Sequence, residues 1–152
     1  EPTEVKLDEL RKYFEVNSIS AFSVCRNFIK NNKKGMIVNV SSLYGSISPR
    51  HGIYSNFVKP IAYSMSKAAL NIMSKYLATY FGPDFRINTV IFGGIPKGKQ
   101  DPKFEASYSE HTPLKRLMKL NEITSVFDFL LSEESSYVTG SEIFVDGGWT
   151  AW

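Results

Sequence analysis

Residues 36–42 read Met36-Ile37-Val38-Asn39-Val40-Ser41-Ser42, a nearly continuous apolar run that ends in two hydroxyl side chains. A short run of this kind predicts a strand that is covered on both faces, as strands are in a parallel sheet. The two serines would then stand at the end of the strand, where a hydroxyl group can assist chemistry at a neighbouring side chain.

Helical and extended patterns alternate on either side of this strand. Upstream, one helix face is predicted by residues that recur at spacings of three and four: Leu7, Leu10, Phe14, Asn17, Ala21, Val24 and Phe28. Downstream, residues 63–81 predict a helix that ends at Gly82-Pro83. Its inward-facing residues are expected to be Ile72, Met73, Tyr76, Leu77 and Tyr80.

The remaining chain continues the alternation. Strands are expected at residues 86–92 and 143–145 and a shorter helix at residues 122–131, whereas residues 96–113 are expected to be flexible. Strands that alternate with helices favour an α/β fold with a parallel sheet, here with about three strands and about three to four helices.

Tyr63 and Lys67 lie four residues apart at the start of the second predicted helix. Positions i and i+4 share a helix face, with Cβ atoms about 5–6 Å apart, so an ammonium group would stand beside a phenol. A neighbouring positive charge favours the phenolate form of a tyrosine, which can then exchange a proton with a carbonyl or an alcohol. The same spacing is also common on solvated helix faces, so the pair alone does not decide between the two interpretations.

Two further polar residues have both a structural and a chemical interpretation. Asn17 interrupts the apolar face of the first helix. A buried amide without a partner costs about 1–3 kcal/mol, so we expect Asn17 to form an interhelical hydrogen bond or to mark a local kink. Ser42 could simply cap the end of its strand.

Composition excludes several classes of protein. The 152 residues are 43 % hydrophobic, enough for one core. No apolar run reaches the roughly 18 residues of a membrane span and no signal-peptide pattern is present, so neither membrane insertion nor export is expected. The single cysteine, Cys25, fits a buried apolar role in a reducing compartment, and we predict a cytoplasmic protein.

The net charge is only +3 and the lysine clusters lack interleaved aromatic residues, so nucleic-acid binding is not expected. His51 and His111 lack partners at metal-ligand spacing, so no metal site is expected.

In order and spacing, these residues resemble the second half of a short-chain dehydrogenase/reductase, a Rossmann-fold family that uses an Asn-Ser-Tyr-Lys tetrad. The resemblance spans the chain and is carried by Asn17, Ser41-Ser42 with Gly45, Tyr63 with Lys67, residues 86–95, residues 137–140 and residues 143–149. It implies a Rossmann-like, doubly wound parallel sheet of which this chain holds only the C-terminal portion, as a single partial domain over residues 1–152.

The resemblance also implies a reaction, the interconversion of a carbonyl and an alcohol by hydride transfer to or from NAD or NADP. Tyr63 would transfer the proton and Ser42 would bind the substrate oxygen. Lys67 would support the phenolate and bind the cofactor ribose. Asn17 would bend its helix and hold a water molecule in a proton relay.

The glycine pair after the second predicted strand would serve the nicotinamide end of the cofactor and the substrate. Gly93 would let the backbone approach the nicotinamide, Ile95 would offer main-chain contact to its carboxamide, and Gly94 would border the substrate. The sequence departs from the family pattern on both sides of this stretch, with Phe92 in place of a proline and Pro96 in place of a threonine.

The glycine-rich turn that begins such folds and holds the cofactor pyrophosphate is missing, since no G-x-x-x-G-x-G follows a strand. We therefore expect a fragment whose cofactor-phosphate-binding half is absent. Its strand at residues 36–40 should be an exposed edge or should pair with another chain. The alternative function is a non-catalytic assembly or dimerisation fragment without cofactor binding. An extended-type sugar epimerase or dehydratase fits less well, because the Asp146-Gly147-Gly148 ending is typical of the short type.

The separation between Ser42 and Tyr63 is longer than usual for the family. The additional segment, residues 51–60, is expected to border the mouth of the active site. Similar insertions occur in reductases that modify flagellin and bacterial surface sugars, which suggests a small carbonyl or alcohol substrate related to sugars. In the family, the two long helices and the C-terminal region also form dimer or tetramer contacts, so a homo-dimer or tetramer is expected.

Overall fold

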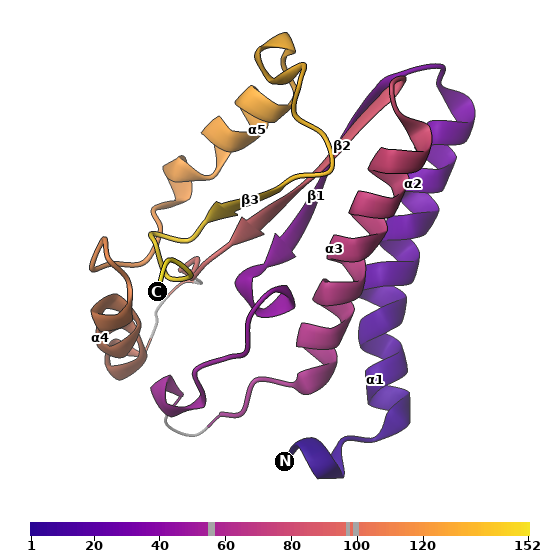
Figure 1. Ribbon diagram of the computed structural model, residues 1–152. Helices are drawn as coiled ribbons and strands as arrows, with labels where there is room; N and C mark the ends of the chain where they lie inside the picture. The colour runs from indigo at the N-terminus through magenta and orange to yellow at the C-terminus, as the bar shows by residue number, and fades with distance from the viewer. Residues whose placement is uncertain (55–56, 97, 99–100) are drawn as a thin grey trace.

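The computed structural model describes residues 1–54, 57–96, 98 and 101–152 and is an α/β arrangement (Figure 1). In chain order the helices and strands are α1 Leu7–Phe14, α2 Ser20–Asn31, β1 Gly35–Ser42, α3 Ile61–Phe81, β2 Phe85–Phe92, α4 Pro102–His111, α5 Thr124–Leu130 and β3 Glu142–Val145. The three predicted strands and the predicted parallel α/β fold are confirmed, with bounds that differ by one or two residues.

The sheet has the order β1-β2-β3, and both strand pairs are parallel. Ser42 is opposite Phe92, and Phe92 is opposite Val145, so the carboxyl ends of the three strands lie at one edge of the sheet. Strand β2 is central and its interior is fully buried, as its apolar sequence predicts. Within the described residues, β1 pairs with β2 alone, which confirms the expectation of an exposed edge strand.

Helices cover both faces of the sheet (Figure 1). On one face, α2 and α3 pack against β2 through the buried residues Cys25, Ile29, Leu77, Ala78, Phe85 and Ile87. On the other, Val90 and Phe92 pack against Leu130 of α5. The alternation of side chains along β2 thus supplies two separate cores, one for each face. Within the described residues, no helix combines the length and the apolar character needed to cross a bilayer.

The first predicted helix contains a π-helical turn that its sequence pattern did not reveal. Residues Glu15–Ile19 form this turn between α1 and α2, and the amide of Ser20 donates to the carbonyl of Glu15, five residues back. A π turn inserts one extra residue into the helix, which shifts the phase of every later position. The predicted inward residues Val24 and Phe28 were therefore wrong: they are 69 % and 38 % exposed, and the following residues, Cys25 and Ile29, are buried instead. Leu7 is exposed as well, because the first turn of α1 has no cover among the described residues.

The predicted inward face of α3 was also partly wrong. Leu77 is buried and Met73 is partly buried, but Ile72, Tyr76 and Tyr80 are 65 %, 67 % and 68 % exposed. Small residues take their place against the sheet and the neighbouring helix, among them Ser66, Ser74 and Ala78. Side chains of this size let the helix approach closely, and the two serine hydroxyls bond to the carbonyls of Tyr63 and Leu70.

The stretch expected to be flexible between residues 96 and 113 contains the helix α4 (residues 97, 99 and 100 lie outside the described part of the chain). Asp101 is its N-cap, with a side chain that accepts a hydrogen bond from the amide of Lys103, and Pro102 occupies the first helical position. Both features are ordinary helix-start signals, which the proline content of this stretch obscured.

Candidate active site

A cavity of about 620 Å³ opens at the carboxyl ends of β1 and β2, between the segment after β1 and the first turns of α3 and α4. It is lined by all the residues that were expected to contact substrate or cofactor, namely Ser42, Tyr63, Lys67, Gly93, Gly94 and Ile95. A hydroxyl, a phenol, an ammonium group and a glycine backbone thus border one space.

A tight turn after β1 is capped by Ser42 and packs against α3 at Lys67. The hydroxyl of Ser42 accepts a hydrogen bond from the amide of Tyr44, 3.3 Å away, and so caps the turn Leu43–Gly45. A Cβ atom at Gly45 would stand 2.8 Å from the backbone carbon of Lys67, so only glycine lets this turn pack directly on α3. The predicted capping role of Ser42 is confirmed, and its hydroxyl also borders the cavity.

The ammonium group of Lys67 donates a hydrogen bond to the carbonyl oxygen of Val40, 3.0 Å away. This contact places the positive charge at the carboxyl end of β1, in the cavity that Tyr63 also lines. Burial lowers the pKa of Lys67, because the charged ammonium is less well solvated there. A lysine with three donor protons retains donors for a bound ligand after bonding to one carbonyl.

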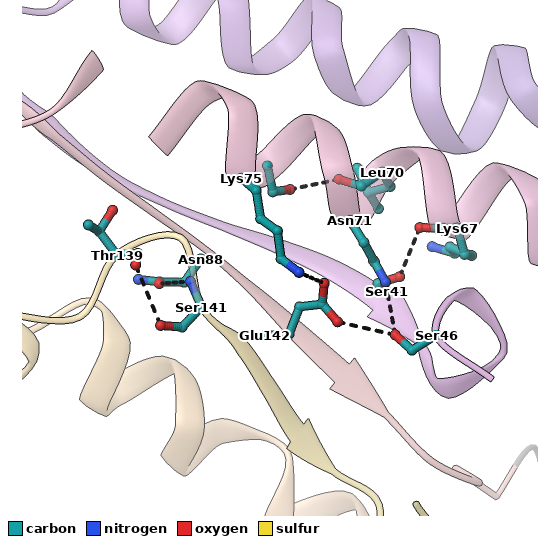
Figure 2. A network of polar contacts seen from close by, with 11 residues as sticks. Ser41, Ser46, Lys67, Leu70, Asn71, Lys75, Asn88, Thr139, Ser141 and Glu142 are labelled. Atoms are coloured by element: carbon teal, nitrogen blue, oxygen red, sulfur yellow. Dashed lines mark hydrogen bonds and ion pairs between the residues drawn. The ribbon is translucent and has the colours of Figure 1, made fainter. Parts of the chain in front are cut away.

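A polar network fixes α3 across the end of the sheet (Figure 2). Asn71 donates from Nδ2 to the hydroxyl of Ser46, which in turn donates to Glu142 of β3 over 3.2 Å. Lys75 forms an ion pair of 2.6 Å with the same glutamate. Since Lys67, Asn71 and Lys75 are spaced by four residues, they lie on one face of α3, and the network orients the helical turn that carries Lys67.

Asn17 does not line the cavity, although it is coupled to it. Its Nδ2 donates to the hydroxyl of Ser66 over 3.0 Å, and that hydroxyl donates to the carbonyl oxygen of Tyr63 over 2.9 Å. The neighbouring Ser18 donates to the carbonyl of Ser66. The expected interhelical hydrogen bond is therefore confirmed, and Asn17 lies within the π-helical turn.

The two glycines after β2 are packed tightly by other parts of the chain. The amide of Gly93 donates to the carbonyl of Val145, and the amide of Gly94 donates to the hydroxyl of Tyr108 over 2.6 Å. A Cβ atom at Gly93 would lie 2.9 Å from the Cα of Asp146, and one at Gly94 would lie 2.7 Å from a methyl carbon of Leu117. Close protein packing is thus sufficient reason for glycine at both positions.

The sequence reasoning did not find the aromatic wall of the cavity. Its members are Tyr44, Tyr54, Phe57, Phe104 and Tyr108. The hydroxyls of Tyr44 and Tyr54 are 2.6 Å apart, and the ring of Tyr54 stacks on that of Phe104 with centroids 5.3 Å apart. Burial raises the pKa of Tyr44 well above its usual value and raises the pKa of Tyr108 to about 12, so both phenols are neutral and act as hydrogen-bonding walls. The available signal was the i, i+4 spacing of Phe104 and Tyr108 after the helix start at Asp101.

Residues 51–60 do border the mouth of the cavity, as expected: Tyr54, Phe57 and Lys59 line it, whereas residues 55 and 56 lie outside the described part of the chain.

The chain is similar to several known proteins over nearly its whole length. Residues 1–150 match the family described as enoyl-(acyl carrier protein) reductase. Glucose 1-dehydrogenase 2 of Bacillus subtilis (strain 168) is 33 % identical over 98 % of this chain and 58 % of its own length. Post-translational flagellin modification protein A of Campylobacter coli is 34 % identical over 80 % of this chain and 48 % of its own length.

Among solved structures, a short-chain dehydrogenase from Leptospira borgpetersenii with bound NAD+ superposes with a TM-score of 0.89. It is 33 % identical and is covered over 59 % of its length, whereas 97 % of this chain is covered. The chain therefore spans between 48 % and 59 % of the length of these relatives.

Proposed function

Because the chain belongs to the short-chain dehydrogenase/reductase family, we propose that it is the catalytic portion of an NAD- or NADP-dependent oxidoreductase that interconverts a carbonyl and an alcohol. The observation that carries the proposal is the cavity shared by Ser42, Tyr63 and Lys67. In this proposal the three residues supply, in turn, a hydrogen-bond donor for the substrate oxygen, a proton-transfer group and a cation in the same cavity.

The residues at the cavity fit the nicotinamide-ribose end of the cofactor. Lys67 uses one donor on the carbonyl of Val40 and has others for ribose hydroxyls. Gly93 and Ile95 also line the cavity. When bound, the nicotinamide supplies or accepts the hydride, and the protein supplies position and electrostatics.

In the direction of reduction, the hydroxyl of Ser42 donates a hydrogen bond to the substrate carbonyl oxygen, and the hydroxyl of Tyr63 gives its proton to that oxygen. In the direction of oxidation, the phenolate of Tyr63 takes the proton of the alcohol. The ammonium of Lys67 stabilises the phenolate in both directions. Asn17 acts through Ser66 by holding the helical turn of Tyr63 in position.

A preceding segment of the protein would supply the cofactor-phosphate site. The open side of β1 is the place where a further parallel strand of such a segment would pair, since it presents unpaired backbone donors and acceptors among the described residues. In this proposal residues 1–152 are one partial domain that is completed by that segment, and the protein resides in the cytoplasm.

A second candidate function is an assembly module without catalysis, and one observation favours it as an additional role. Ile72, Tyr76 and Tyr80 form an exposed apolar stripe along α3, and the rings of Tyr76 and Tyr80 stack at 6.2 Å. An exposed stripe of this kind is typical of a subunit interface. We assign it to a homo-dimer or tetramer contact.

We propose a small-molecule substrate. One relative is named glucose 1-dehydrogenase 2, which favours a sugar-related compound.

The test is a titration with NADH and NADPH, followed by a turnover assay on sugars and simple ketones, on the chain alone and on the proposed full-length protein. We expect the full-length protein to bind a cofactor and to turn over substrate. The Tyr63→Phe variant should lose the turnover. Binding of neither cofactor by the full-length protein would leave the assembly role as the function.

A further inference from the structure

Tyr108 connects the helix α4 to the glycine pair that follows β2. Its side chain is 3 % exposed and lines the cavity, and its hydroxyl accepts a hydrogen bond from the amide of Gly94 over 2.6 Å. Burial raises the pKa of Tyr108 to about 12, so the phenol is neutral at ordinary pH. A neutral hydroxyl can accept the amide proton without placing a charge in the cavity.

The peptide groups around Gly94 are held from two sides. Tyr108 binds the amide of Gly94, and the carbonyl oxygen of Gly94 accepts a hydrogen bond from the amide of Met118 over 3.1 Å. A Cβ atom at Gly94 would lie 2.8 Å from a ring carbon of Tyr108, and one at Gly93 would lie 2.8 Å from its hydroxyl oxygen. The phenol therefore fits directly against the backbone of both glycines, and a shift of one requires a shift of the other.

The C-terminal segment anchors Tyr108 on its other side. The ring of Tyr108 stacks on that of Trp149, with centroids 4.3 Å apart and an interplanar angle of 17°. Trp149 is 2 % exposed, and its amide donates to the carbonyl of Asp146, whose carboxylate accepts a hydrogen bond from the amide of Thr150. A buried, stacked aromatic pair of this kind has a defined geometry. The hydroxyl of Tyr108 thus meets Gly94 from a fixed position.

The backbone of this glycine pair is the part of the cavity to which we assign the substrate and the nicotinamide. Hydride transfer depends strongly on geometry, since a displacement of about 1 Å can cost about 10²-fold in rate. We propose that Tyr108 is a positioning residue for hydride transfer: its hydroxyl fixes the peptide of Gly94, and with it the backbone against which substrate and nicotinamide lie. Tyr108 itself transfers no proton. This inference rests on the proposed oxidoreductase function and adds a residue that acts through Gly94.

The experiment compares two substitutions that each remove one buried hydroxyl from α4 or its end. Tyr108→Phe removes the acceptor of the Gly94 amide and keeps the ring that stacks on Trp149. Thr112→Val is the matched control, because the hydroxyl of Thr112 is buried and donates to the carbonyl of Tyr108 over 2.9 Å, without contact to Gly94.

Two quantities are measured in the proposed full-length protein, below its melting temperature. The first is kcat and KM with glucose and with cyclohexanone. The second is the hydrogen-exchange rate of the Gly94 amide, followed by NMR after labelling with ¹⁵N-glycine, which needs no turnover.

We expect kcat of Tyr108→Phe to fall about 10- to 100-fold while KM changes by less than about threefold, because the lost bond supports the reacting geometry more than binding. The Gly94 amide should exchange about 10-fold faster or more, since it has lost its acceptor. Thr112→Val should keep kcat within about twofold and leave the exchange rate of Gly94 unchanged. A similar loss of melting temperature in both variants would show that stability does not explain the difference in kcat.

The other outcomes overturn the inference in distinguishable ways. Unchanged exchange of the Gly94 amide in Tyr108→Phe means that the hydrogen bond does not protect this amide in solution. Faster exchange with unchanged kcat makes the bond a structural one and leaves the oxidoreductase standing. Equal losses of kcat in both variants assign the effect to α4 as a whole. Absence of turnover of both compounds by the unsubstituted protein overturns the oxidoreductase and the positioning role together.

Discussion

The side-chain Nδ2 of Asn17, in the π-helical turn, donates a hydrogen bond to the hydroxyl of Ser66 in α3, 3.0 Å away. Through that hydroxyl it reaches the carbonyl oxygen of Tyr63, one helical turn earlier. The irregular turn of one helix is thereby connected to the backbone of the residue to which we assign proton transfer.

This connection predicts a coupled effect on stability. Asn17→Ala should lower the free energy of unfolding by about 1 kcal/mol and leave the Ser66 hydroxyl without its donor. In a double-mutant cycle, Asn17→Ala and Ser66→Ala should be non-additive by about 0.5 kcal/mol or more when urea unfolding is measured. Asn31→Ala serves as the control, since the exposed side chain of Asn31 donates to the carbonyl of Asn27 one turn earlier in the same helix. Strict additivity would show that the two side chains do not support one another.

Replacement of Tyr63 tests proton transfer. Tyr63→Phe should reduce kcat by about 10²- to 10⁴-fold, the usual contribution of a general acid or base, while the melting temperature changes little. Tyr76→Phe on the exposed side of the same helix is the matched control, and should retain activity. Comparable losses in both variants would point to a disturbance of α3 instead of lost chemistry.

The two serines at the end of β1 should differ in their effect on turnover. Ser42→Ala should reduce kcat/KM by about 10²-fold, as expected when one donor to a reacting oxygen is removed. Ser41→Ala should have a much smaller effect, because Ser41 is 5 % exposed and its hydroxyl contacts the carbonyl of Lys67 at 3.5 Å. A larger loss in Ser41→Ala would reverse the assignment of the substrate donor.

The exposed stripe on α3 predicts an oligomeric state. A charge at Tyr76 would have to be buried at a subunit interface, so Tyr76→Glu should shift the protein toward a monomer in light scattering after gel filtration. Leu120→Glu is the control, because Leu120 is 64 % exposed and lies outside the stripe, the two long helices and the C-terminal motifs. An unchanged mass for Tyr76→Glu would place any subunit contact elsewhere.

The ion pair between Arg116 and Glu122 predicts that the stability of the fold depends on pH. Arg116 forms two hydrogen bonds with Glu122, of 2.7 Å and 2.6 Å, and the amide of Lys119 adds a third. The hydrogen bonds from Arg116, followed by that from Lys119, lower the pKa of Glu122 to about 2. A depressed carboxyl pKa stabilises the folded state above the unfolded value of about 4.3, and this contribution is lost as the pH falls toward 2.

The corresponding measurement is urea unfolding at several pH values between about 5 and 2. Glu122→Gln should flatten the fall in stability over this range, whereas Glu134→Gln, outside the Arg116 contact, should follow the unsubstituted protein. Parallel curves for all three proteins would mean that the ion pair contributes nothing in solution.

The parallel sheet was predictable because its strands are short apolar runs, and the joint position of Tyr63 and Lys67 because i and i+4 residues share a helix face. The inward faces of the helices were less predictable from the sequence. A fixed helical period cannot anticipate the π turn at Glu15–Ile19, and hydrophobicity alone favoured Tyr76 and Tyr80 over the small Ser74 as inward residues.

The aromatic wall escaped prediction for a different reason. It is assembled from separate loops and α4, and residues such as Tyr44, Tyr54 and Phe104 meet only in the folded chain. No local pattern in the sequence records such a meeting.

The π turn also sets how the chain tolerates a change of length. The turn holds one residue more than an α-helical turn, so deleting a single residue between Glu15 and Ile19 would let α1 and α2 join as one ordinary α-helix. Cys25 and Ile29 would keep their places against the sheet, whereas Asn17 would lose the widened turn from which it reaches Ser66. A deletion within α2 has no extra residue to remove, and would rotate everything after it by about 100° about the helix axis.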